Sequence, residues 1–323
     1  MKPLGAPMDR QERLAEDALS SVPFLDPHSV RYEPAMSGAA SPSYQGVEST
    51  LYRVTQADSE QPSLFLKVHQ AECTDLFDPA FAFKAGRRLA ELDLTPEPLH
   101  LAADQGAVLF RLLGPEWRPA TLDLLGTETC LSAVVEALRR VTQGPPLGKG
   151  WTVFDGIADM RARLGAEAET LPDDAWWLFD GVAAIADALA AAGADSRPAH
   201  GDPHATNIML GPDGAVRLVD LDMACDTDPH YQLAALLNEA CQFDSEMRTG
   251  IEMWNGVWSE ALYNRCVAYA AADDLYWGLR ALLLDRLSPR TSLEFRKYAG
   301  WRLLRCRMRV NRPGFEETLR RLG

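Results

Sequence analysis

The chain has 323 residues, 46 of them acidic and 32 basic, which gives a formal net charge of −14. This length is sufficient for one large two-lobed protein or for two domains with full hydrophobic cores. The acidic surplus disfavours a nucleic acid as the partner, because its phosphates would be repelled, and it is compatible with a cationic substrate.

The sequence carries no signal for export or for a membrane span. Residues 1–11 lack a basic segment followed by an apolar one, and no apolar run reaches 18 residues. The six cysteines are scattered, without a CxxC pair or a Cys/His cluster at zinc spacing. These features predict a cytoplasmic protein whose thiols stay reduced.

The first third of the chain is expected to be rich in strands. A short amphipathic helix over residues 9–20 comes first. Two apolar runs, residues 51–54 and 64–68, are separated by polar and turn-forming residues, which predicts adjacent antiparallel strands. An Asp-Pro pair, suited to a helix N-terminus, opens the segment 78–92, and residues 107–110 are typical of another strand.

The remainder of the chain is expected to be mainly helical. Helix-spaced apolar residues occur in five segments, residues 122–142, 173–192, 231–241, 259–287 and 292–309. One β-hairpin interrupts them, with strands at 208–210 and 216–219 around a Gly-Pro-Asp-Gly turn. The sequence therefore predicts an α+β protein with a β-rich lobe over residues 1–112, a hinge near 110–115 and a helical lobe over 113–323.

The most informative motif runs from His200 to Asp220. Phosphoryl transfer needs one carboxylate to position and deprotonate the attacking hydroxyl, and oxygen ligands to hold Mg²⁺ on the nucleotide phosphates. Asp202, Asn207 and Asp220 supply these groups in that order. The alternative is that Asp202 and Asn207 form turns and Asp220 ends a strand. The combined spacing favours Asp202 as the catalytic base, with Asn207 and Asp220 as metal ligands.

A lysine and a loop upstream are candidates for binding nucleotide phosphates. Lys67 lies within an apolar strand, and with Asp202 downstream a phosphate-binding role is favoured over that of an ordinary solvated lysine. The loop that ends at Gly46 permits close backbone approach, and the hydroxyls of Ser41, Ser43 or Ser49 could donate hydrogen bonds. This loop lacks a GxGxxG spacing, so the residues do not distinguish it from a surface loop.

Three further side chains have two interpretations each. Asp222 lies on the same side of an extended segment as Asp220, so it either contacts the metal or substrate or caps the following loop. His204 is expected to orient the loop, because Asp202 already occupies the position of the base. Trp277, close in sequence to two acidic residues, is either a core residue or an aromatic face for a quaternary ammonium ion.

At these residues the chain resembles the aminoglycoside phosphotransferase and choline kinase superfamily, whose fold is like that of the protein kinases. The family's His-x-Asp-x-x-x-x-Asn loop matches His200, Asp202 and Asn207. Its metal-binding strand matches residues 218–222, and the Asp-Pro pair that follows matches Asp228-Pro229. Upstream, its glycine-led strand matches Gly46 to Val54, and its phosphate-binding lysine matches Lys67.

This resemblance, which spans residues 32–309, implies several further properties. The cofactors are ATP and Mg²⁺, with the nucleotide in the first lobe and the catalytic loop and substrate site in the second. Phosphate contacts come from Lys67, Gly46 and Ser49, and backbone groups of Phe110 to Leu112 take the adenine.

The C-terminal part is similar to choline and ethanolamine kinases. Residues 238–241 and 272–280 resemble the helices of their substrate pocket, which implies that Glu239 and Trp277 face the substrate cation. Three departures accompany this likeness: Gln232 replaces a common Asp, Arg280 replaces a second aromatic residue, and the helix at 79–92 offers no clear Glu to pair with Lys67.

The leading hypothesis is transfer of the ATP γ-phosphate to a hydroxyl of a small cationic amino alcohol, similar to choline or ethanolamine. The first alternative is an aminoglycoside, or another polyol or sugar, as the acceptor. Such an acceptor would require many carboxylates distributed over the substrate site. The second alternative is a catalytically weak nucleotide-binding scaffold, and the missing Glu partner of Lys67 favours it.

Overall fold

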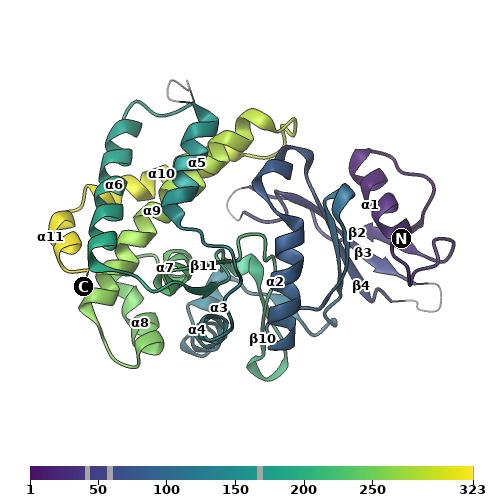
Figure 1. The fold of residues 1–323 in the computed structure, drawn as a ribbon, viewed down its shortest axis with the longest axis horizontal. Coiled ribbons are helices and arrows are strands. Elements are labelled where there is room, and N and C mark those ends of the chain that lie inside the picture. The colour runs from purple at the N-terminus through teal and green to yellow at the C-terminus, as the bar shows by residue number, and fades with distance from the viewer. Residues whose placement is uncertain (41–43, 57–60, 166–169, 323) are drawn as a thin grey trace. The chain divides into compact units, whose positions relative to one another are not determined.

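A computed structural model describes residues 1–40, 44–56, 61–165 and 170–322. The chain divides into two compact units (Figure 1). The first unit contains Met1–Arg118 and Met209–Met223, and the second contains Pro119–Ile208 and Ala224–Gly323. The hairpin segment 209–223, which the sequence-based division after residue 112 assigns to the helical lobe, packs with the first unit.

The first unit is built on a six-stranded antiparallel sheet. The strand order is β1-β2-β3-β4-β6-β5. The strands are β1 (Lys2–Pro3), β2 (Arg31–Pro34), β3 (Ser49–Thr55), β4 (Leu64–His69), β5 (Pro98–Ala102) and β6 (Ala107–Arg111). The predicted pairing of the runs at 51–54 and 64–68 is confirmed, because β3 and β4 are antiparallel neighbours.

One face of this sheet is covered by α1 (Arg10–Ser20). Leu66 and Val68 of β4 are buried in the cluster that also contains Leu19 of α1. Successive side chains of a strand point to opposite faces. Lys67, between Leu66 and Val68, is therefore directed to the face away from α1.

The helices of the first unit begin as the sequence predicts. The side chain of Asp9 caps α1, and that of Asp78 caps α2 (Pro79–Glu91) by accepting the N–H of Phe81. Proline at the first position of α2 costs no hydrogen bond, because that N–H would have no partner within the helix. Two 3₁₀ turns complete the connections, η1 (Ala71–Leu76) and η2 (Ala103–Gln105).

The predicted hairpin is present as β9 (Ile208–Leu210) and β10 (Val216–Leu218), and the turn between them contains η4 (Pro212–Gly214). Asp213 and Gly214 have positive φ angles of 55° and 76°, which Asp tolerates better than most residues and Gly adopts freely. The N–H of Leu218 donates to the carbonyl of Leu94, so the end of β10 is tied to the first unit. Asp220 follows directly.

The second unit is helical, with one small sheet. Its helices are α3 (Leu122–Leu125), α4 (Glu128–Thr142), α5 (Val153–Leu164), α6 (Ala175–Ala192), α7 (Pro229–Ala240), α8 (Met247–Asn255), α9 (Glu260–Leu287), α10 (Phe295–Val310) and α11 (Phe315–Arg320). The strands β8 (Arg197–Ala199) and β11 (Cys225–Thr227) pair antiparallel, and η3 (Ala205–Asn207) and η5 (Asp244–Glu246) are short 3₁₀ turns. The strand β7 (Arg118–Pro119) stands where the chain leaves the first unit.

The helix α9 is buried along most of its length, and α5, α7 and α10 pack around it (Figure 1). This explains why its apolar residues do not form a single stripe. The predicted continuous helix over 122–142 is wrong. Thr127 caps a new helix by accepting the N–H of Cys130, so α4 begins after a break.

One helix, α6, has the length and apolar content that a membrane span requires. Such a helix also occurs in soluble proteins, so composition alone is weak support for a span. Leu178, Val182, Ile185 and Leu189 are its buried leucine, valine and isoleucine residues, spaced by three and four positions. They form one apolar stripe, as expected for a helix packed on α9, α10 and α11.

Candidate functional site

The loop from His200 to Asn207 joins β8 to β9, and its start is fixed by α7. The backbone N–H of the fully buried His200 donates to the side-chain oxygen of Gln232, at 3.0 Å. The side-chain nitrogen of Gln232 donates to the carbonyl of Leu138 in α4. Gly201 has a φ of 83°, which only glycine adopts without strain. Gln232, a departure from the family pattern, is thus a structural support of this loop.

The carboxylate of Asp202 is held on both oxygens. Its Oδ1 lies 2.7 Å from Nδ1 of His204, and its Oδ2 accepts a 2.9 Å hydrogen bond from Nδ2 of Asn207. Burial raises the pKa of Asp202, but the charge and hydrogen bond of His204, with the charges of His200 and Arg280, together outweigh burial and the pKa is lowered. Asp202 is therefore ionised at neutral pH. With its nitrogen on Asp202, the amide of Asn207 leaves its oxygen for another partner, such as a cation.

His204 is buried between Asp202 and the indole of Trp277, whose ring centre lies 5.3 Å away. Burial lowers the pKa of His204, and the carboxylate of Asp202 more than reverses this, raising it to about 9. A protonated imidazole cannot accept a proton, so His204 is suited to orienting Asp202 rather than to general-base catalysis.

Two residues expected to face the substrate lie beneath the same loop. Glu239 of α7 accepts a hydrogen bond from the N–H of Ala205. Trp277 of α9 is 2% exposed and also packs on the guanidinium of Arg280, at 5.6 Å. The contacts of both residues support the loop, and a direct contact with substrate stays a prediction.

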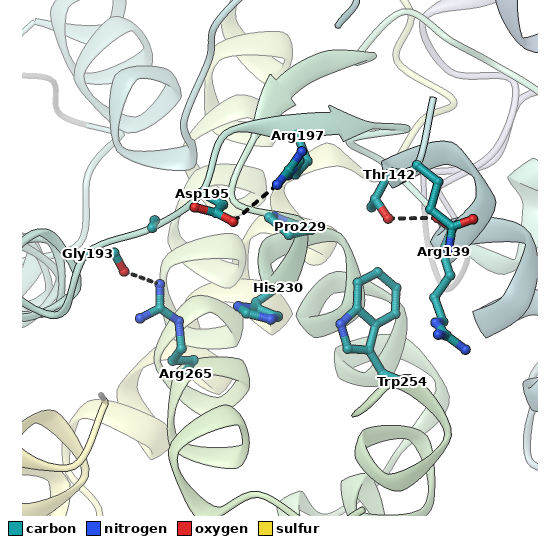
Figure 2. A pocket seen from close by; sticks show the side chains of 11 residues that line it. Arg139, Thr142, Gly193, Asp195, Arg197, Pro229, His230, Trp254 and Arg265 are labelled. Atoms are coloured by element: carbon teal, nitrogen blue, oxygen red, sulfur yellow. Dashed lines mark hydrogen bonds and ion pairs between the residues drawn. The ribbon is translucent and has the colours of Figure 1, made fainter. Parts of the chain in front are cut away.

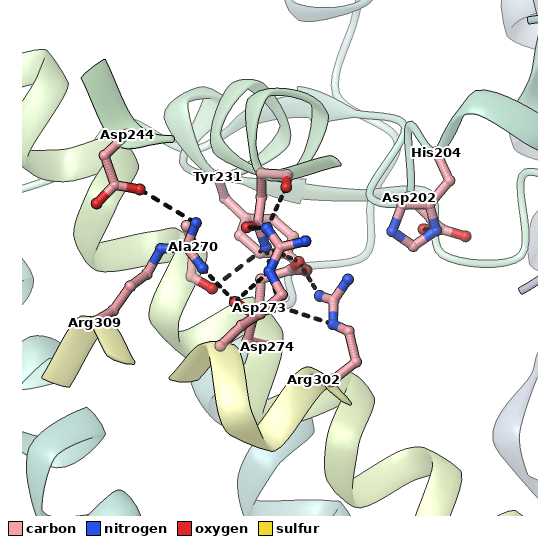
Figure 3. A network of polar contacts seen from close by, with 11 residues as sticks. Asp202, His204, Tyr231, Asp244, Ala270, Asp273, Asp274, Arg302 and Arg309 are labelled. Carbon is pink, nitrogen blue, oxygen red and sulfur yellow. Dashed lines mark hydrogen bonds and ion pairs between the residues drawn. The ribbon is translucent and has the colours of Figure 1, made fainter. Parts of the chain in front are cut away.

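The two acidic residues before Trp277 take part in a buried charge network (Figure 3). Asp273 and Asp274 are fully buried, and Arg302 of α10 pairs with both, at 2.9 Å from Asp274. Tyr231 donates to Asp273, and Arg309 pairs with Asp274. These arginines neutralise the two carboxylates, so neither is available to a substrate cation in this conformation.

In the first unit, Lys67 is enclosed by two carboxylates. Its ammonium lies 2.6 Å from Asp220 and 2.6 Å from Asp222. Burial lowers the pKa of Lys67, but these two charges raise it above the ordinary lysine range. Nε2 of His69 lies 2.8 Å from Asp222, and its ring stacks on Phe77. The side chain of Asp222 is therefore held by two residues of β4, and its contact with a metal ion or substrate stays a prediction.

Asp220 has the properties expected of a metal ligand. Its φ of 64° is unusual for a residue with a side chain, and such conformations occur often at functional sites. Its side chain is 41% exposed, whereas that of Asp222 is buried. Carboxylate and amide oxygens, as in Asp220 and Asn207, are ligands that Mg²⁺ prefers. Among the described residues, no group of three His, Cys, Asp or Glu side chains forms a closed metal site.

The candidate phosphate and adenine contacts are all in the first unit. Gly46 has a φ of 55°, and a Cβ atom at Gly38 would meet its carbonyl oxygen at 2.5 Å, so this loop requires glycine. The hydroxyl of the buried Ser49 has no hydrogen-bond partner among the described residues, which suits a ligand oxygen. Ser41 and Ser43 lie outside the described residues.

The hinge residues Phe110 and Leu112 follow each other closely at the end of β6. Phe110 stands opposite Phe65 of β4, and the N–H of Leu112 donates to the carbonyl of Ser63 at 3.0 Å.

The sequence reasoning did not single out His69. Its signal was available, because residues two apart on a strand share a face and Lys67 precedes it by two.

The sequence matches the model of a phosphotransferase enzyme family over residues 41–266. No curated protein matches the chain. A choline/ethanolamine kinase family protein from Mesorhizobium loti has a similar structure, with a TM-score of 0.77 and 21% identity over 97% of this chain and 99% of that one. The choline kinase LicA from Streptococcus pneumoniae gives a TM-score of 0.74 and 15% identity, over 93% and 98% of the two chains.

A GDP complex of an aminoglycoside 2'-phosphotransferase is also similar, with a TM-score of 0.61 and 12% identity over 94% of this chain and 99% of that one. Identities this low show a shared fold, and the predicted protein-kinase-like α+β architecture is confirmed. The family match covers more than half of the sequence, so the chain belongs to the phosphotransferase enzyme family. It is a small-molecule phosphotransferase.

Proposed function

We propose that this phosphotransferase moves the γ-phosphate of ATP to a hydroxyl of a small cationic amino alcohol, similar to choline or ethanolamine. The observation that carries the proposal is the state of Asp202, a largely buried carboxylate kept ionised mainly by His204 and oriented by Asn207. Such a group can accept the hydroxyl proton as the oxygen forms its bond to phosphorus and ADP leaves.

The cofactors of this proposal are ATP and Mg²⁺. Asn207 and Asp220 would hold the metal ion through their side-chain oxygens, as the family resemblance also implies. When bound, Mg²⁺ neutralises charge on the phosphates. Lys67 would give up part of its contact with Asp220 in order to bind phosphate oxygens. Its ammonium would stay paired with Asp222, which is itself held by His69.

Three observations support a cationic acceptor. The net charge of −14 raises the local concentration of cations near the protein. Choline and ethanolamine kinases are among the proteins with similar structures. Glu239 lies directly behind the catalytic loop, bonded to Ala205. The half-buried Cys241 is a free thiol, which supports the cytoplasm as the compartment.

An aminoglycoside or another sugar is the second acceptor class, supported by the similar structures of aminoglycoside and spectinomycin phosphotransferases. A broad acidic trough would favour it, but Asp273 and Asp274 are occupied by arginines. The scaffold alternative loses its main support, because Lys67 has carboxylate partners in Asp220 and Asp222.

A panel of acceptors tests the proposal. ADP release with ATP and Mg²⁺ should be fast with choline, ethanolamine or a related amino alcohol, and slow with kanamycin and with simple sugars. If kanamycin alone were turned over, the acceptor class would be an aminosugar and not an amino alcohol. ATP binding without turnover of any hydroxyl compound would favour a scaffold.

A further inference from the structure

A pocket lies in the helical unit, at the end of β8 opposite the loop that carries Asp202. The loop follows Ala199 at one end of β8, whereas Arg197 at the other end lines the pocket. Its volume is about 560 Å³, within the range of sites for small organic ligands. Among the described lining residues, none is a residue that we assign to phosphoryl transfer.

Most of the ionisable side chains that line this pocket are basic (Figure 2). Arg139 of α4, Arg197 of β8 and Arg265 of α9 contribute three guanidinium groups, and His230 comes from the first turn of α7. Asp195 is the one acidic residue among the described lining residues. In a chain with a net charge of −14, this concentration of positive charge favours an anionic ligand.

Arg265 provides a rigid wall. Its Nη2 lies 2.6 Å from the carboxylate of Asp228. It also donates to the carbonyl of Gly193 at 2.9 Å, a contact drawn in Figure 2. The side chain is buried, and its Nε has no hydrogen-bond partner among the described residues. The two contacts of Nη2 hold the guanidinium in one position at the wall of the pocket.

The other two arginines are free to turn toward a ligand at little cost. Arg139 pairs with Glu136 at 3.3 Å and Arg197 with Asp195 at 3.5 Å, and the side chains of both pairs are exposed to solvent. Exposed ion pairs of this kind contribute between zero and about 1 kcal/mol. An anion that accepts hydrogen bonds from both guanidiniums can therefore replace these pairs.

An aromatic side chain completes the pocket. Trp254 of α8 lines it, and its ring meets that of His230 edge to face, with centres 6.5 Å apart. In Figure 2 the indole and Arg265 lie on opposite sides of His230. An indole offers apolar area to a flat ring at a low entropic cost, so the pocket combines cationic groups with an aromatic wall.

We propose that this pocket binds a small ring-bearing organic anion, either a carboxylate or a phosphate ester. The guanidinium groups of Arg265, Arg197 and Arg139 attract the anionic group, and the ring lies against Trp254. The pocket is separate from the phosphotransfer site and does not depend on the identity of the acceptor.

Phenyl phosphate and benzoate are suitable probes, because they share the ring and differ in the anion. Their binding to the full-length protein is measured by calorimetry, with and without saturating ADP and Mg²⁺ to occupy the nucleotide site. We expect saturable one-to-one binding of at least one probe, unchanged by ADP, and none of uncharged benzyl alcohol. Arg197→Ala, Arg139→Ala and Trp254→Ala should each weaken binding about tenfold, as for lost charged or aromatic contacts.

Arg320→Ala, which changes an exposed arginine on α11, is the matched control and should bind as the unmodified protein does. Thermal unfolding of each variant checks that it is folded. The proposal is overturned if neither probe binds saturably, if ADP displaces the probe, or if the three pocket variants bind it as well as Arg320→Ala.

Discussion

The ammonium of Lys67 lies 2.6 Å from the carboxylate of Asp222, and both side chains are buried. In this chain Asp222, with His69 behind it, occupies the role of an acidic partner that the helix α2 does not supply. Lys67, the candidate phosphate lysine, is thus fixed by the segment that also carries the candidate metal ligand Asp220.

Asp222→Asn removes the charge that compensates Lys67 inside the first unit. We expect the free energy of unfolding to fall by about 3 kcal/mol, as for a broken buried ion pair, and the KM for ATP to rise. Urea denaturation and initial-rate kinetics measure the two effects. Asp93→Asn is the control, because Asp93 forms an exposed pair with Arg217 and should change stability by less than about 0.5 kcal/mol. Equal stability of the two variants would contradict the account.

His204 makes stability dependent on pH. Its folded pKa of about 9 lies above the unfolded value near 6.5, so the folded state binds the proton more tightly. This contribution, about 3 kcal/mol, is fully present below about pH 6.5 and is lost as the pH rises through 9. Urea denaturation at both ends of this range measures it. His204→Asn should flatten this part of the profile, and an unchanged slope in that variant would argue against the ion pair with Asp202.

Arg302 compensates two carboxylates beneath the catalytic loop. Replacing it with Met leaves Asp273 and Asp274 short of positive charge in the interior. We expect a loss of about 4 kcal/mol in the free energy of unfolding, measured by chemical denaturation. Arg302→Lys should recover part of this loss, because an ammonium cannot reproduce the planar guanidinium contacts. Arg320→Ala, at an exposed position, should lose less than about 0.5 kcal/mol.

Gly156 allows α5 to approach α9 closely. A Cβ atom there would lie 2.6 Å from Trp151 and 2.8 Å from Tyr276. Gly156→Ala should therefore destabilise the protein by about 2 kcal/mol, since both rings would have to shift. Gly300→Ala in α10 meets no atom within 4 Å, and alanine is the better helix former. A thermal unfolding scan should show the melting temperature falling for the first variant and rising for the second.

Local signals in the sequence were sufficient for several elements. The Asp-Pro pair at residues 78–79 predicted the start of α2, and the Gly-Pro-Asp-Gly turn predicted the β9–β10 hairpin, because caps and tight turns depend on adjacent residues. The start of α5 had such a signal too. Thr152 and Asp155 form a capping box there, a pattern that the sequence reasoning overlooked.

The partners of charged residues were less predictable. Arg302 and Asp273 are 29 positions apart, and nothing local pairs them. Lys67 and Asp222 are 155 positions apart, and no local pattern in the sequence pairs them either. The strands β8 and β11, of three residues each, are too short for an alternating pattern to identify. Such contacts depend on the tertiary fold.

The central claim is that Asp202 is the base in phosphoryl transfer. Its most direct test is the rate of phosphorylated product formation by Asp202→Asn, with saturating ATP, Mg²⁺ and the best acceptor of the panel. The asparagine keeps the shape and cannot take the proton, so kcat should fall at least about a hundredfold, with ATP affinity and far-ultraviolet circular dichroism unchanged. A kcat within a few-fold of the unmodified protein would contradict the claim.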